Sequence, residues 1–306
     1  MFLKVCNHRK IIYMGYVPTD ARTQELTPRI VPKGMACEEI AIPGDGRVKL
    51  HGINVSRLSQ TSIEEKPPQT VLVYMQGNAG NPLMRLPIFE RLLMGPPIPS
   101  PSEIKPLDLF ILAVAPRSYW KSSRRTPTQP GITSDYRRIL TYASRRFPTS
   151  NIVLYGHSLG GAVCVCLIAE LRAEEFPNVR GLVLENPFVS IPGMVKALYT
   201  QRWLPYHHLG AFAFDKWDAL AATQQASPDS LLRKLSPTLM LLLSKDDELV
   251  PNTMGESLFD ASGGLCTSEA HVRRKVVLRN ALHENAWKER KWLTEMRRYI
   301  QEVGKW

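Results

Sequence analysis

The sequence lacks an apolar run long enough for a membrane span, because no stretch approaches the roughly 18 consecutive apolar residues that such a helix needs. Its N-terminal stretch, MFLKVCNHRKIIYMGYVP, has neither a long apolar core nor a small-residue cleavage site, so we expect no secretory signal. Cysteine is sparse: the five are odd in number and scattered, which predicts reduced thiols rather than a disulfide framework. We therefore expect a cytoplasmic protein, with peripheral association as its one form of membrane contact.

Acidic residues are in deficit, and the formal net charge is +11. The excess is local: residues 117–146 hold eight Arg or Lys against Asp135 alone, and residues 273–298 hold nine bases against three acids. No recognition helix, zinc-finger spacing or RNP-like aromatic motif accompanies them, so we expect no nucleic-acid partner. Two interpretations stay open: a solvated basic face, or attraction to an anionic membrane surface worth about 1 kcal/mol per base. Equal sedimentation with neutral and anionic liposomes would contradict the attraction.

Length and composition are those of one large globular domain. The chain has 306 residues, 44% of them hydrophobic, and such a length can bury roughly 75% of the surface of the unfolded chain. Residues 1–36 form a basic, loop-rich N-terminal segment, and we expect a single domain over residues 37–306. Two strand-like runs around a Gly-Asp-Gly turn predict a hairpin over residues 37–56.

Short, nearly continuous apolar runs then alternate with helical patterns. Strands covered on both faces by helices have this composition, so the alternation predicts an α/β sandwich around a mostly parallel central sheet. In the last helical pattern Leu293, Met296, Ile300 and Val303 fall at helical spacing and should face the core. The predicted strands are 70–75, 109–115, 151–155, 181–185, 238–244 and 275–279, and the predicted helices are 134–147, 160–176 and 286–303.

Two regions interrupt the alternation. Residues 94–106 are rich in proline and should form a loop. Residues 187–235 form an insertion between two strands, and such insertions commonly lie over the active site as a partial lid. Its aromatic residues suggest an apolar acyl chain as ligand, and packing of the lid on the core explains them equally well. They are Phe188, Trp203, Tyr206, Phe212 and Phe214.

The stretch GHSLGG at residues 156–161 fits G-x-S-x-G. In that motif a nucleophilic serine occupies a strained turn between a strand and a helix. A predicted strand precedes Ser158 and a predicted helix follows it, which is the context that the motif requires. The backbone N–H of the next residue, Leu159, would be one donor of the oxyanion hole.

A serine nucleophile needs a base, and the base needs an acid to orient it. We expect His283 to be the base, because it follows the last predicted strand, where such sheets place ligand-facing groups. His157 adjoins the nucleophile but should leave the turn in another direction. His207 and His208 lie in the predicted lid, and His271 precedes its strand. Asp246 and Asp247 compete as the acid, and capping of the following helix is another common use of an aspartate.

At these residues the chain resembles the α/β-hydrolase-fold serine hydrolases. In that family the acid commonly sits in G-x-x-D-x-x-V-P, and SKDDELVP at residues 244–251 brings Asp247 into register. QGNAGN at residues 76–81 is similar to the family's H-G-N-A-G-N, with Gln76 in place of histidine. The resemblance implies that the backbone N–H of Asn78 is the second oxyanion donor, and that a Ser158–His283–Asp247 triad works without a metal or another cofactor.

Within the fold the chain looks like the membrane-associated α/β-hydrolase-domain-containing proteins that include protein depalmitoylases. The similar stretches include LENPF at residues 184–188 and KWD at residues 216–218. The family tends to have R-G-Y-G-x-S-x-G where this chain has RSYWKSSR, so Ser118, Trp120 and Arg124 replace glycines, which puts substrate shape in doubt. The resemblance implies a hydrolase for small-molecule or acyl-protein esters or thioesters. A peptidase and a non-catalytic binding module remain as alternatives.

Overall fold

The computed structural model describes residues 8–58, 66–95, 107–199, 213–266 and 272–305. Within these ranges eight strands form one sheet in the order β1-β2-β4-β3-β5-β6-β7-β8. β2 runs antiparallel to both β1 and β4, and every other neighbouring pair is parallel. The strands are β1 (Met35–Pro43), β2 (Lys49–Arg57), β3 (Thr70–Met75), β4 (Leu109–Val114), β5 (Asn151–His157), β6 (Val179–Glu185), β7 (Leu239–Ser244) and β8 (Arg274–Leu278).

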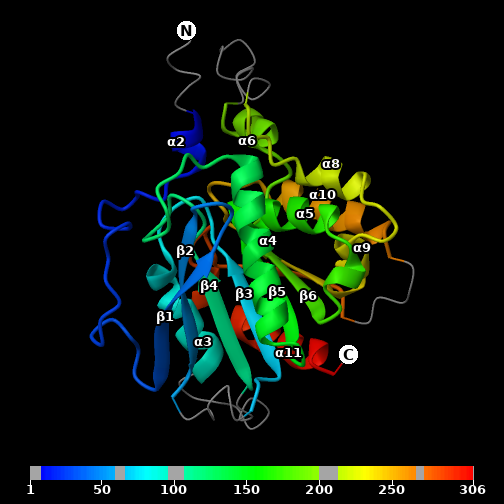
Figure 1. Cartoon of the computed structure of the whole chain (residues 1–306). Coiled ribbons are helices and arrows are strands. Elements are labelled where there is room, and N and C mark those ends of the chain that lie inside the picture. Colours follow the sequence, from blue (N-terminus) through cyan, green and yellow to red (C-terminus); the bar gives the residue numbers. More distant parts are fainter. Residues whose placement is uncertain (1–7, 59–65, 96–106, 200–212, 267–271, 306) are drawn as a thin grey trace.

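Helices cover both faces of this sheet (Figure 1). α4 and α5 lie on one face, while α3 and α11 lie on the other and contact each other there. The helices are α2 (His8–Ile12), α3 (Leu86–Met94), α4 (Gln129–Arg146), α5 (Leu159–Glu170), α6 (Ile191–Leu198), α8 (Ala219–Gln224), α9 (Leu231–Leu235), α10 (Asn252–Gly263) and α11 (Arg290–Val303), with short 3-10 turns at Pro82–Arg85, Ala173–Glu175, Ser236–Thr238 and Ala286–Lys288.

The predicted α/β sandwich is confirmed, and so is the hairpin, which is formed by β1 and β2. Every residue of β3, β4 and β7 is buried, which is why their apolar runs show no alternation. The apolar stripe of the last helix is buried as expected, at Leu293, Met296, Ile300 and Val303. The pair Cys164 and Cys166 lies buried inside α5, and burial raises the pKa of the Cys166 thiol to about 12.

Helix ends were predicted less well than strands. α5 stops at Glu170 rather than at residue 176, because Leu171 turns to an extended conformation and its carbonyl accepts a hydrogen bond from the N–H of Leu231 at 2.7 Å. That contact joins the end of α5 to the start of α9, and local propensity carries no trace of it. α4 begins earlier than predicted, where the Thr128 hydroxyl accepts from the N–H of Gly131 at 3.1 Å and caps the first turn.

The insertion at residues 187–235 divides into two parts. In its second half α8 and α9 pack against α5, and the expectation of a partial lid stays a prediction. In the first half, α6 follows β6 and lies at the top of Figure 1. Phe188 is buried, whereas Phe214 is 68% exposed. The other aromatic residues expected to form a lid, Trp203, Tyr206 and Phe212, are outside the described residues.

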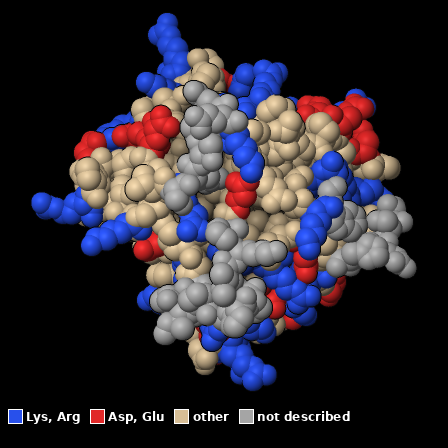
Figure 2. All heavy atoms as spheres, turned by 90° about the horizontal axis from the view of Figure 1, so that it is seen from below, with Lys and Arg blue, Asp and Glu red and all other residues tan. Residues whose placement is uncertain are grey.

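The end of the molecule opposite α6 carries a dispersed positive charge. Seen from below, Lys and Arg spread over the surface with Asp and Glu among them (Figure 2). This distribution suits the interpretation of a solvated face. The expected attraction to an anionic membrane stays a prediction.

Candidate active site

Ser158 occupies a strained turn between β5 and α5. Its backbone has φ 52° and ψ −119°, and a non-glycine residue in this sparsely populated region costs about 1–3 kcal/mol. The surrounding chain holds the turn: the N–H of Ser158 donates to the carbonyl of Glu185 at 2.9 Å. A Cβ at Gly160 would lie 2.1 Å from the carbonyl oxygen of Met75, so only glycine fits there. The sequence motif therefore stands in the strand–turn–helix context that it requires.

His283 and Asp247 meet at the same edge of the sheet. The Nδ1 of His283 lies 2.8 Å from Oδ2 of Asp247, and the two side chains are 3% and 1% exposed. Asp247 follows β7 and His283 follows β8, so the parallel strands bring two distant residues together. An ionised carboxylate only accepts, so Nδ1 carries the proton and Nε2 is left as the basic nitrogen.

Asp247 is held in its ionised form. Its Oδ1 accepts from the N–H groups of Leu249 at 2.9 Å and Val250 at 2.8 Å. Burial alone would raise the pKa of Asp247, but the hydrogen bonds from His283 and from the Val250 N–H outweigh it and lower that pKa. Its competitor Asp246 is exposed. Asp247 is not the N-cap of the next helix either, because Pro251 holds that position.

The predicted oxyanion loop, residues 76–81, passes beside Ser158. A Cβ at Gly77 would lie 3.7 Å from Cβ of Ser158, so the loop backbone runs alongside the serine. On the other side Leu159 is the first residue of α5, and a first helical N–H has no acceptor within its own helix. Gln76, which replaces the family's histidine, is 5% exposed, and its side-chain amide has no hydrogen-bond partner within the described part of the chain.

Known proteins resemble the chain in sequence. The family model for serine aminopeptidases of the S33 type matches residues 125–235. Protein bem46 of Schizosaccharomyces pombe is 28% identical over 265 residues, which cover 85% of this chain and 75% of that protein. Lysophosphatidylserine lipase ABHD12 of Danio rerio is 28% identical over 142 residues, which cover 46% of this chain and 36% of the lipase. The chain thus matches about a third of the length of that relative.

Solved structures share the fold. An esterase of Pyrococcus furiosus superposes with a TM-score of 0.63 at 14% identity, covering 92% of this chain and 95% of the esterase. A fungal esterase of Rhizomucor miehei superposes with a TM-score of 0.62 at 14% identity, covering 97% and 91% of the two chains. The chain has the α/β-hydrolase fold. The predicted fold, the family resemblance and the assignment to the hydrolytic enzymes are confirmed.

Three side chains contact the backbone of His283, and the sequence did not predict these contacts. Its carbonyl lies 3.1 Å from Nε2 of His157 and accepts from Nδ2 of Asn186 at 3.1 Å. Its N–H donates to Glu248 at 3.0 Å. Asn186 also bonds the N–H of Ser244 at 2.8 Å, so it ties β6 to β7 and to the histidine loop. The available signal was an asparagine directly after β6, since Asn tolerates the left-handed conformation that it adopts at φ 46°.

Of the four other histidines considered as the base, the structure describes His157. His157 is buried, and burial lowers its pKa to about 4, so its ring is neutral near pH 7. It supports the carbonyl of His283 rather than Ser158, as expected from its direction. His207, His208 and His271 are outside the described residues.

One trio near the site has the geometry to share a cation. Donor atoms of His157, His283 and Glu284 lie within 4.8 Å of one another. However, a guanidinium nitrogen of Arg85 already bonds Glu284 at 2.7 Å, and a second positive charge there would be repelled. The expectation that no metal or cofactor is needed stays a prediction.

The segment at residues 117–124, which departs from the family pattern, keeps the positive φ angles that glycine would favour at two positions. Ser118 and Trp120 have φ of 70° and 43°. The Trp120 indole is 2% exposed and donates to the carbonyl of Gln24 at 2.8 Å, and Gln24 in turn accepts from Asn81 of the loop; an effect of Trp120 on substrate shape stays a prediction. Tyr119 is the residue that contacts the loop, through its hydroxyl.

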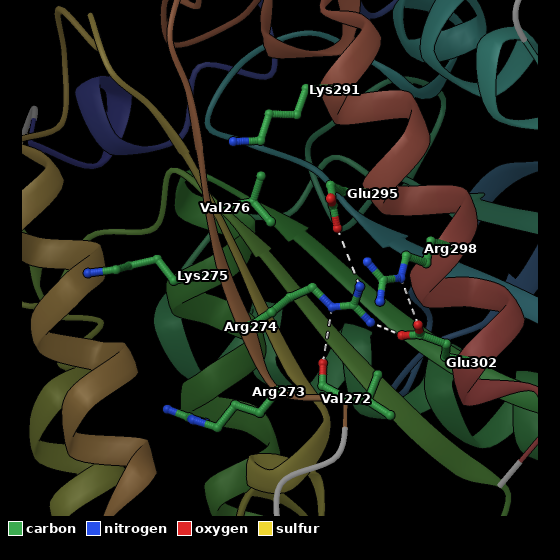
Figure 3. Close-up of a pocket in the computed structure, with 9 residues that line it drawn as sticks. All are labelled: Val272, Arg273, Arg274, Lys275, Val276, Lys291, Glu295, Arg298 and Glu302. Atoms are coloured by element: carbon green, nitrogen blue, oxygen red, sulfur yellow. Dashed lines mark hydrogen bonds and ion pairs between the residues drawn. The ribbon is translucent and has the colours of Figure 1, made fainter.

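A basic hollow lies apart from Ser158, between β8 and α11 (Figure 3). Arg274 pairs with Glu295 at 3.3 Å and also with Glu302, and Arg298 pairs with Glu302 at 2.9 Å. An anion entering the hollow would have to displace these carboxylates, so Arg274 and Arg298 of the basic segment at residues 273–298 are already paired. Among the described helices, none is long and apolar enough to cross a membrane.

Proposed function

We propose that the hydrolase is a serine esterase or thioesterase whose triad is Ser158, His283 and Asp247. The observation that carries the proposal is the buried 2.8 Å contact between Nδ1 of His283 and Asp247. It stands at the sheet edge where the nucleophile turn emerges, and it leaves Nε2 as the only basic nitrogen of that imidazole.

The chemistry would proceed through an acyl-enzyme. Oγ of Ser158 attacks the carbonyl carbon of the substrate while Nε2 of His283 takes the hydroxyl proton. The tetrahedral intermediate collapses, the bond to the leaving oxygen or sulfur breaks, and the imidazolium returns its proton to the leaving alcohol or thiol. Water then attacks the acyl-enzyme with the same base and releases the acid. Asp247 stays ionised and stabilises the imidazolium.

The negative charge on the carbonyl oxygen would be received by the N–H groups of Leu159 and Asn78. Loss of one such donor typically costs about 2.7–4 kcal/mol in transition-state stabilisation. The N-terminus of α5, at Leu159, adds the positive end of its helix dipole.

An apolar acyl group of an acyl-protein or a lipid fits the surroundings best. Leu249 and Leu282 are 47% and 45% exposed. Leu282 directly precedes His283, and the N–H of Leu249 donates to Asp247, so apolar surface flanks the proposed triad. Phe214 presents an exposed aromatic ring beside Arg9. A related protein is named as a lysophosphatidylserine lipase, which is compatible with such a substrate.

A series of p-nitrophenyl esters tests the acyl preference. Each buried methylene contributes about 0.8 kcal/mol, so we expect kcat/KM for octanoate to exceed that for acetate by about tenfold or more. Purified wild-type protein and S158A are compared at ester concentrations below micelle formation. Faster turnover of acetate would contradict an apolar acyl site while leaving the triad intact.

Peptidase activity is the second candidate, because the matching family model is that of serine aminopeptidases and covers the nucleophile. Aminoacyl p-nitroanilides distinguish the two. Faster cleavage of an aminoacyl anilide than of any ester would assign a peptidase. A folded wild type that no fluorophosphonate labels would instead favour the non-catalytic binding module.

A further inference from the structure

The carbonyl of Asn78 is held by two donors from outside its own loop. The N–H of Met14 donates to it at 2.6 Å, and the hydroxyl of Tyr119 donates at 3.0 Å. Both bonds fix the peptide group between Asn78 and Ala79. This group directly follows the N–H of Asn78, which we assign to the oxyanion hole. The backbone of Asn78 therefore has little freedom to rotate that N–H away from Ser158.

The N-terminal segment, residues 8–24, is bound along the rest of the loop as well. The N–H of Gly80 donates to the carbonyl of Val17 at 2.8 Å. Nδ2 of Asn81 donates to the carbonyl of Ala21 at 2.9 Å and to Oε1 of Gln24 at 2.8 Å. The loop and the N-terminal segment thus form one hydrogen-bonded unit.

This segment is itself anchored in the body of the protein, so it can serve as a rigid support. Arg9 pairs with Asp215 at 2.8 Å, whose other oxygen accepts from the N–H of Gln129 at the start of α4. Tyr13 accepts from the indole N–H of Trp217 at 2.8 Å. Tyr13 and Trp217 are 2% and 0% exposed.

Tyr119 is held equally firmly. It is 1% exposed and packs so closely on Gly15 that a Cβ there would lie 2.7 Å from its ring. Its neighbours Ser118 and Trp120 keep left-handed backbones, and the Trp120 indole bonds Gln24 of the N-terminal segment. The hydroxyl of Tyr119 is therefore placed by packing from both sides.

Such a support has a physical reason. The loop contains Gly77 and Gly80, the latter at φ 82°, and glycine leaves a backbone free to take many conformations. An oxyanion donor is effective only where it is aimed in advance at the developing charge. We propose that Tyr119 and the N-terminal segment are positioning residues that hold the Asn78 loop in its donating conformation. The effect of this support on catalysis rests on the proposed function.

Tyr119→Phe tests the proposal by removing one hydroxyl from a buried ring. Since loss of a whole oxyanion donor costs about 10²–10³ in kcat, loosening one should lower kcat by about tenfold with KM nearly unchanged. Amide hydrogen exchange of residues 76–81 should become faster while that of α5 does not change. Gly15→Ala, which must push the Tyr119 ring or the N-terminal segment aside, should have the same two effects.

Tyr142→Phe is the matched control, because Tyr142 lies on α4 and is only partly buried; neither readout should change. Unchanged exchange at residues 76–81 in both Tyr119→Phe and Gly15→Ala would overturn the proposal, and so would an unchanged kcat in an active enzyme. If wild type hydrolyses no ester, the proposed function fails, and the exchange experiment alone still decides whether the loop is supported.

Discussion

Replacing Ser158 by alanine is expected to lower kcat for ester hydrolysis by roughly 10⁴-fold or more, because removal of the nucleophile leaves only binding and the oxyanion donors. Alanine occupies the same turn with one atom fewer, so the free energy of unfolding should change by less than about 1 kcal/mol. Labelling by a fluorophosphonate probe, which reacts only with an activated serine, should disappear. Gel fluorescence and initial rates measure the two effects on the same preparation.

Ser257→Ala provides the control, because Ser257 lies exposed on α10 and its hydroxyl bonds the Thr253 carbonyl one turn earlier. It should label and turn over like wild type. Persistent labelling of S158A would show that another residue reacts. A thermal transition much below that of wild type would mean that the turn, rather than the nucleophile, had been damaged.

The sequence predicted the parts of the fold that depend on local pattern. β3, β4 and β7 are buried on both faces, so their apolar runs were unmistakable. The turn at Ser158 was recognisable because close backbone approach admits only glycine at position 160. His283 and the pair Asp246 and Asp247 were singled out because each follows a strand of a parallel sheet, and the carboxyl ends of such strands share one edge. The choice of Asp247 came from the family's G-x-x-D-x-x-V-P pattern.

What the sequence could not predict are contacts between segments that lack a pattern of their own. The residues that hold the backbone of His283 come from β5, the end of β6 and the loop after β7. The support of Asn78 comes from Met14 and Tyr119, which are far from it along the chain. The partner of Trp120 was hidden for the same reason: its size was visible, but the direction of its indole toward Gln24 depends on tertiary packing.

Asp247→Asn is expected to lower kcat by about 10²–10⁴-fold with a much smaller effect on KM. An amide side chain can donate to Nδ1 of His283, which favours the tautomer whose Nε2 carries the proton and cannot accept one from Ser158. It also removes the negative charge that stabilises the imidazolium. Steady-state rates with a p-nitrophenyl ester near neutral pH measure the loss. Asp246→Asn is the matched control, and because that carboxylate is exposed it should change kcat less than about twofold.

The same pair carries a pH signature that separates charge from shape. The pKa of Asp247 is lowered in the folded protein below its ordinary value of 3.8, so its ionised form stabilises the fold above that value, and this contribution is lost as pH falls through the folded pKa. Asp247→Asn has no proton to gain. Its deficit in unfolding free energy relative to wild type should therefore be full above about pH 5 and shrink as pH falls below about 4. A deficit that stays constant across this range would mean that Asp247 contributes through its shape and hydrogen bonds and not through its charge.

If Asp246→Asn rather than Asp247→Asn abolished turnover, the assignment of the acid would be reversed.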